Sequence, residues 1–158
     1  MKKIAMMVTI ILLFLTACSK QEGPPVELLR YLENKKFKII SYEGRQPSFL
    51  LTKENLLNSS YMMSWGLQDP DLDLIKLLGK TVYVEKFVVT NHPISTANVD
   101  VIVFVIDNKP IGGISNESPN NNVIQLGGGY SIDGKTIEEV HDMNFDEWQT
   151  YWMDKYSK

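Results

Sequence analysis

The chain of 158 residues has a single cysteine, only two histidines and no apolar run of the about 20 residues that span a bilayer. One cysteine cannot form an intramolecular disulfide, and it cannot by itself build a thiolate metal site. The chain also has no run of Lys or Arg, and its net charge is -3. A mildly acidic domain has no electrostatic reason to bind nucleic acid or anionic lipid, so neither partner is expected.

The N-terminus is the most informative segment that is present. Lys2 and Lys3 precede an apolar stretch, residues 4–15, which has the length and charge of a secretory signal. Leu15-Thr16-Ala17 then places small residues before Cys18. This arrangement resembles the lipobox of bacterial lipoproteins, in which the cysteine thiol receives a diacylglyceryl group and the chain is cut before that cysteine.

We therefore predict a signal peptide at residues 1–17 and a lipidated tether at residues 18–25. The diacylglyceryl cysteine, carrying chains such as palmitate, would hold the protein on the outer face of the cytoplasmic membrane. An ordinary cleaved signal peptide and an unusually short uncleaved anchor remain alternatives. With Cys18 acylated, no cysteine is left for catalysis or metal binding.

The remaining chain has the composition of one globular domain, residues 26–158. The full chain is 44% hydrophobic and 22% charged, which argues against disorder. Lys2 and Lys3 leave with the signal peptide, which changes the net charge from -3 to -5.

Periodicity and turn residues predict helices alternating with strands, and the second half of the domain is dominated by strands. Val99 to Ile106 is a near-continuous apolar run typical of a strand covered on both faces. Gly44-Arg45-Gln46-Pro47-Ser48 has the composition of a turn between two short strands. The predicted helices are 26–32, 70–78, 137–140 and 145–156, with a helical turn at 53–57; the predicted strands are 37–42, 49–52, 81–90, 99–106, 111–115, 123–126 and 130–132. The pattern indicates an α+β fold, a mostly antiparallel sheet of about four to six strands with helices packed on one face.

Three aspartates at alternate positions, Asp69, Asp71 and Asp73, imitate the start of a calcium-binding loop. The sixth position of that loop would be Leu74 instead of Gly, and the twelfth would be Lys80 instead of Glu. Carboxylates at a helix N-terminus are favoured by the helix dipole, and Asp69 with the proline after it is a typical helix start. No metal ion is therefore expected here.

The two histidines are the remaining candidates for chemistry. His92 lies in Asn91-His92-Pro93, where the proline favours an extended strand end. His141 is expected at the C-terminus of a helix, where a partly protonated imidazole suits the dipole. No catalytic residue, cofactor site or metal site is assigned. Gly112-Gly113 and Gly127-Gly128-Gly129 match no phosphate or dinucleotide loop, and are better explained by bulges or close packing of the backbone.

The C-terminal segment carries Phe145, Trp148, Trp152 and Tyr156 at spacings of three, four and four. These spacings put the rings on one side of a helix. The helix is expected to close the core, and a binding face for sugars or membrane is the alternative.

Several short motifs resemble small lipoproteins of Gram-positive bacteria that carry a domain of unknown function. They are Trp65-Gly66, Gly79-Lys80, Asn91-His92-Pro93, Ile111-Gly112-Gly113, Asp133-Gly134-Lys135-Thr136 and Glu147-Trp148. The resemblance implies a one-domain extracytoplasmic lipoprotein, and it brings no activity or catalytic residue.

The sequence leaves three classes of function open. The leading expectation is an interaction or binding module for an envelope protein or peptide, which an exposed apolar patch would support. Binding of a small ligand, as an accessory to transport or sensing, would need a pocket with convergent polar groups between helix and sheet. An envelope hydrolase, the least favoured class, would need His92 or His141 beside a carboxylate.

Overall fold

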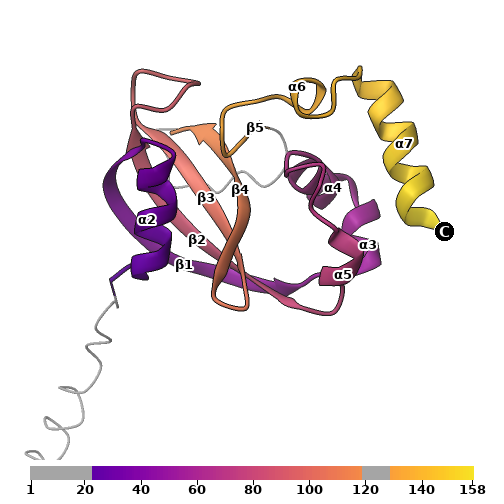
Figure 1. Ribbon diagram of the computed structural model, residues 1–158, viewed down its shortest axis with the longest axis horizontal. Coiled ribbons are helices and arrows are strands. Elements are labelled where there is room, and N and C mark those ends of the chain that lie inside the picture. Colours follow the sequence, from indigo (N-terminus) through magenta and orange to yellow (C-terminus); the bar gives the residue numbers. More distant parts are fainter. Residues whose placement is uncertain (1–22, 119–128) are drawn as a thin grey trace, which may run out of the picture.

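The computed structural model describes residues 23–118 and 129–158 (Figure 1). Several predictions lie outside these residues: the signal peptide, the Leu15-Thr16-Ala17 motif with Cys18, and the strand at 123–126. Within the described residues no helix is both long and apolar enough to cross a membrane.

The centre of the fold is a five-stranded sheet in the order β1-β2-β3-β4-β5. Its strands are β1 (Lys38–Leu50), β2 (Thr81–Thr90), β3 (Val99–Ile106), β4 (Lys109–Glu117) and β5 (Tyr130–Ser131), and every neighbouring pair is antiparallel. Asp107 and Asn108 join β3 to β4 in a tight turn with positive φ angles of 51° and 61°. The predicted α+β class and antiparallel sheet are confirmed.

The helices lie on both faces of this sheet, which corrects the expectation that they pack on one face. They are α2 (Val26–Asn34), α3 (Lys53–Leu57), α4 (Ser59–Gly66), α5 (Leu74–Leu77), α6 (Ile137–His141) and α7 (Phe145–Ser157). Figure 1 shows α2 on one side of the sheet and α3, α4, α5 and α7 on the other. Leu28 and Leu32 of α2 pack with Val101 in one core cluster. Trp65 of α4 and Trp148 of α7 belong to the second cluster.

Strand β3 explains why both faces need a cover. All of its side chains are buried, and alternate residues point to opposite faces of the sheet. Val99, Val101, Val103 and Val105 join the α2 cluster, whereas Ile102, Phe104 and Ile106 join the α4 and α7 cluster. The prediction of a strand covered on both faces is confirmed, and it requires helices on both sides.

The predicted turn at residues 44–48 is wrong, because β1 continues through it. The pairing of β1 with β2 shifts register between Tyr42 and Gly44 and again between Gln46 and Phe49. Such bulges accommodate Gly44, with φ at 85°, and Pro47 in an edge strand, where a missing backbone donor is tolerated.

Helix α5 is shorter than predicted and begins at a different cap. The Asp73 side chain accepts a hydrogen bond from the Lys76 N–H and caps α5. Asp69 instead accepts from the Asp71 N–H, which closes a local turn. The predicted helices at 137–140 and 145–156 are confirmed as α6 and α7, and each begins with a capping box, formed by Thr136 with Glu139 and by Asn144 with Glu147.

Candidate functional site

A cleft of about 430 Å³ lies beside the outer edge of β4. This volume falls in the range of pockets that hold small ligands. Its apolar lining residues are Leu67, Pro70, Ile111, Ile132 and Val140, and its charged lining residues are Lys35, Asp69, Asp133 and Lys135. We refer to this site as the β4 cleft.

The sheet explains where the β4 cleft forms. Strand β5 pairs only with Ile114 and Ser115, so among the described residues no strand covers the earlier part of the β4 edge. Helix α2 and the segment 67–70 belong to opposite faces of the sheet, and both extend past this edge. Ile111 and Gly112 of β4 line the space between them.

Gln68 closes the part of the edge next to β5. Its Oε1 accepts a hydrogen bond of 2.7 Å from the Gly113 N–H, and its Nε2 donates to the Gly113 carbonyl at 3.2 Å. The same Nε2 donates to the Ser64 carbonyl. The buried side-chain amide therefore takes the place that the peptide group of a neighbouring strand would occupy.

The two glycines make this contact possible. A Cβ on Gly112 would lie 2.1 Å from the Gln68 Oε1, and Gly112 has a φ of +150°. A Cβ on Gly113 would lie 2.2 Å from the Ile102 carbonyl oxygen. The prediction that Gly112-Gly113 serves a bulge and close packing is confirmed, because the β3–β4 register also shifts after Phe104.

Lys35 reaches the cleft from the C-terminal end of α2. Its Nζ lies 2.7 and 2.8 Å from the two carboxylate oxygens of Asp133. The Lys35 side chain is 20% exposed, whereas that of Asp133 is 54% exposed. The ammonium also lies 5.2 Å from the centre of the Tyr31 ring. The cation is therefore the enclosed member of the pair, and the carboxylate is the accessible one.

Tyr31 contributes a neutral hydroxyl to the same flank. Burial raises the pKa of its phenol to about 12, and the nearby Asp133 carboxylate adds to the rise. The phenol therefore keeps its proton at neutral pH and can both donate and accept hydrogen bonds.

The segment from Ser131 to Lys135 forms one end of the cleft as a tight turn. The buried Ser131 hydroxyl accepts from the Asp133 and Lys135 N–H groups, and the Ser131 N–H donates to the Lys135 carbonyl. Gly134 has a φ of +81°, which a turn of this kind requires from glycine. The turn fixes the backbone positions of Asp133 and Lys135 at the mouth of the cleft.

His92 does not line the cleft. Its Nδ1 accepts from the Ile94 N–H, so its Nε2 carries the proton and donates to the Ile132 carbonyl at 3.1 Å. Burial lowers the pKa of the imidazole, which keeps it neutral. The residue follows the end of β2 as predicted, and it ties the β2–β3 connection to the segment after β5.

His141 lies at the C-terminus of α6, as predicted, but the expected partial protonation is not supported. Its Nε2 donates to the Gly66 carbonyl at 2.7 Å, and burial lowers its pKa. Desolvation of the ring thus outweighs the hydrogen bond to the Gly66 carbonyl, which alone would raise the pKa. The two imidazoles bond to different backbone carbonyls, and neither has a carboxylate as hydrogen-bond partner among the described residues.

The aspartates of the calcium-like segment have local roles. Asp69 and Asp73 accept backbone N–H groups, and Asp73 also pairs with Lys76. In residues 23–118 and 129–158, no group of three or more His, Cys, Asp or Glu is arranged to hold a metal ion.

The aromatic stripe of α7 belongs to the core. Trp148, Trp152 and Tyr156 are buried, and the Trp152 Nε1 donates to the Leu56 carbonyl. The expectation that α7 closes the core is confirmed. Tyr151, beside the stripe, is 44% exposed.

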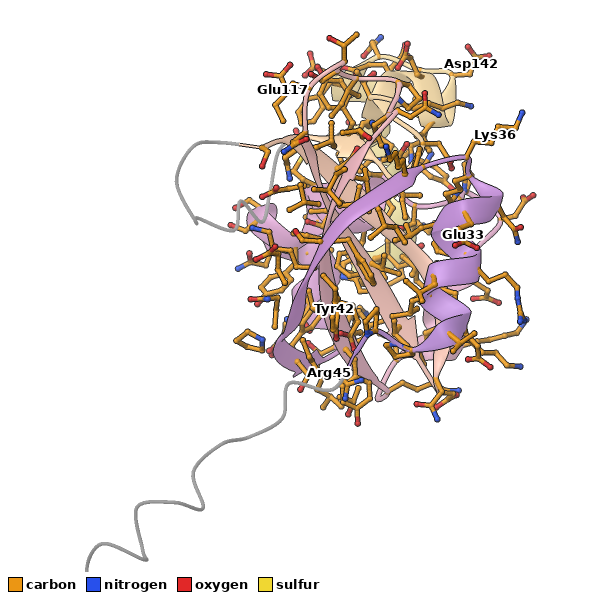
Figure 2. All side chains as sticks on the ribbon, turned by 90° about the vertical axis from the view of Figure 1, so that its left-hand side faces the viewer. Glu33, Lys36, Tyr42, Arg45, Glu117 and Asp142 are labelled. Carbon is orange, nitrogen blue, oxygen red and sulfur yellow. The ribbon has the colours of Figure 1, made fainter. Side chains whose placement is uncertain are left out.

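Two charge pairs with at least one buried member lie away from the cleft. The fully buried Glu85 accepts from the Tyr42 hydroxyl and from the Arg45 Nε. Figure 2 labels Tyr42 and Arg45, which both belong to β1. Lys86 and Asp100 form a second pair at 2.8 Å, with both side chains about nine-tenths buried. Each pair connects two neighbouring strands, so we assign both to the stability of the sheet.

No family model matches the chain, and no curated protein or solved structure is significantly similar to it. The function is therefore inferred from the geometry of the described residues. Sequence reasoning noted Gly112 and the Asp133-Gly134-Lys135 motif, but it did not connect them. It missed Tyr31, Lys35 and Gln68, because nothing local in the sequence shows that α2 and the segment after α4 meet at one strand edge.

Proposed function

We propose that the protein is an extracytoplasmic lipoprotein, anchored through Cys18, that binds a small ligand in the β4 cleft. The observation that carries this proposal is the convergence of polar side chains from three separate segments, residues 31–35, 68–69 and 131–135, on one open strand edge. Binding of an envelope protein or peptide has less support. The large exposed apolar side chains are distributed over α2, β1, α5, β5 and α7.

The chemistry of the cleft fits binding better than catalysis. Its lining combines two lysines, two carboxylates, the Tyr31 phenol and an apolar floor. Neither imidazole lines it, and both are held by backbone groups. These groups can orient a small polar molecule, and the apolar floor can bury its carbon atoms.

Ligand capture tests the proposed function. The full chain in non-ionic detergent would be mixed with a small-molecule extract of the host bacterium, passed through a desalting column and analysed by mass spectrometry. Replacement Ile111→Trp should fill the cleft and lower the retention of the bound molecule about tenfold, a loss equivalent to about 1.4 kcal/mol. The control Ile75→Trp changes an exposed residue of α5 outside the cleft and should retain the molecule.

Both variants must show the cooperative unfolding of the unaltered protein for the comparison to hold. If the unaltered protein retains no molecule beyond what Ile111→Trp retains, the β4 cleft is not a ligand site. Retention of an envelope protein in place of a small molecule would support the interaction module instead.

The anchor is tested separately. Cys18→Ala should abolish incorporation of labelled palmitate and move the protein out of the detergent phase, because only the thiol can carry the diacylglyceryl group. Ser19→Ala is the matched control and should leave labelling intact. A Cys18→Ala protein that is still labelled and still partitions into detergent would show that the lipobox interpretation is wrong.

A further inference from the structure

The charged groups of the β4 cleft are divided between its two flanks. Lys35, which directly follows α2, lies on one flank, and Lys135 lies on the adjoining turn after β5. Asp69 lies on the opposite flank, in the segment between α4 and α5. A ligand that spans the cleft therefore meets two lysines and one carboxylate, Asp133, at one end, and the Asp69 carboxylate at the other.

The cationic end already holds one carboxylate. Asp133 contacts the Lys35 Nζ through both oxygens, and both residues line the cleft. An ammonium has three N–H donors, so Lys35 keeps one for a further acceptor. Lys135 is exposed and makes no ion pair with another described residue. The two lysines together can accommodate a second carboxylate.

The anionic end is complementary. Asp69 is exposed, and its carboxylate accepts one backbone N–H, that of Asp71. It makes no ion pair with any lysine or arginine of the described residues. Its charge is therefore available to an ammonium group entering the cleft.

Between these ends the lining is apolar. Leu67, Ile111 and Ile132 come from three different segments and face the same space. We propose that the ligand of the β4 cleft is a small zwitterion with an apolar body, such as a free amino acid with an aliphatic side chain. Its carboxylate binds Lys35 and Lys135, and its ammonium binds Asp69. This inference rests on the proposed function of the cleft.

The test uses three related probes: L-leucine, N-acetyl-L-leucine, which lacks the ammonium, and L-leucinamide, which lacks the carboxylate. Each is titrated into the full chain in detergent micelles, and binding is followed by the NMR resonances of the Gly112 and Ser131 backbone amides. Leucine should shift both resonances and bind about tenfold more tightly than either analogue, because each analogue loses one charge-assisted contact.

Two variants assign the ends of the ligand. Asp69→Asn should weaken leucine binding about tenfold and leave N-acetyl-leucine binding unchanged. Its control Asp71→Asn lies in the same segment but does not line the cleft. Lys135→Gln should weaken the binding of leucine and of N-acetyl-leucine alike. Its control is Lys109→Gln, because Lys109 does not line the cleft.

The outcomes separate this inference from the proposed function. The proposal of a zwitterionic ligand would be overturned if leucine and N-acetyl-leucine bound equally tightly. It would also be overturned if Asp69→Asn left the affinity for leucine unchanged. Absence of any shift with all three probes would also overturn it. In each of these cases the proposed function stands if Ile111→Trp lowers the retention of a molecule from the extract. The proposed function fails together with the inference if Ile111→Trp leaves retention unchanged.

Discussion

Replacing Gln68 by Ala is the sharpest test of how the β4 cleft is built. The side-chain amide makes three hydrogen bonds to backbone groups, and Gln68 is 4% exposed. The Gly113 carbonyl keeps a second donor, the Ile132 N–H, after the replacement. The Gly113 N–H loses its acceptor, the Gln68 Oε1, and is therefore the backbone group most destabilised by the replacement.

The magnitude follows from these contacts. A buried donor without a partner costs about 1–3 kcal/mol, and each net hydrogen bond contributes about 1 kcal/mol. Because the cleft is open, water can reach the freed Gly113 N–H and offset part of this cost. We expect a loss of about 2 kcal/mol in the free energy of unfolding, which lowers Tm by about 8 °C for a domain of this size.

Urea denaturation followed by tryptophan fluorescence measures this change. Gln149→Ala, on the exposed side of α7, is the matched control and should stay within about 0.5 kcal/mol of the unaltered protein. A Gln68→Ala protein that loses less than about 0.5 kcal/mol would refute the role of this amide as the cover of the strand edge.

Three further predictions concern the core and the buried charges. Trp148→Ala should lower the free energy of unfolding by about 3–5 kcal/mol in a urea titration, because the ring is fully buried; a loss below about 0.5 kcal/mol would contradict its place in the core. Asp100→Asn leaves the Lys86 charge buried without its partner and should lower the free energy of unfolding by about 3–5 kcal/mol. The control Asp107→Asn breaks an exposed pair and should lower it by at most about 1 kcal/mol. Equal losses for the two variants would refute the distinction between buried and exposed pairs. The folded-state pKa of His92 lies below the usual 6.5, so the contribution of His92 to stability is complete above pH 6.5 and declines as the pH falls through the lowered pKa. His92→Asn should reduce this loss of stability between about pH 7 and pH 5, measured as Tm in thermal melts. An unchanged dependence of Tm on pH would show that His92 does not titrate in this way.

Much of the fold follows from local signals in the sequence. The structure confirms the helices predicted at 137–140 and 145–156 and the strand predicted at 99–106. The aromatic stripe of α7 also has its predicted place in the core. In each case the local sequence pattern and the observed burial involve the same neighbouring residues. Tertiary packing therefore agrees with the local structural preference.

The errors arise where tertiary contacts decide between local alternatives. Gly44 and Pro47 favour a turn in isolation, yet pairing with β2 extends β1 through them with two bulges. Asp69 and Asp73 both have the side chain of a helix cap, and the packing of Leu74 in the core favours the later start. Local propensities of about 1 kcal/mol are smaller than the burial of one leucine, which contributes about 1.5–3 kcal/mol.

The cleft itself could not be predicted, because it depends on the lengths of two strands. Strand β4 spans Lys109–Glu117, and β5 has only Tyr130 and Ser131 to pair with it. An exposed strand edge invites pairing with another chain, so natural proteins cover such edges. Here Gln68 covers the β4 edge at Gly113. Helix α2 and the segment 67–70 lie beside the remaining part of this edge and leave the β4 cleft open between them. A short β5 thus produces both the need for the Gln68 contact and the open volume beside it. Lengthening β5 by design would close the cleft, which links the binding proposal to the topology of the sheet.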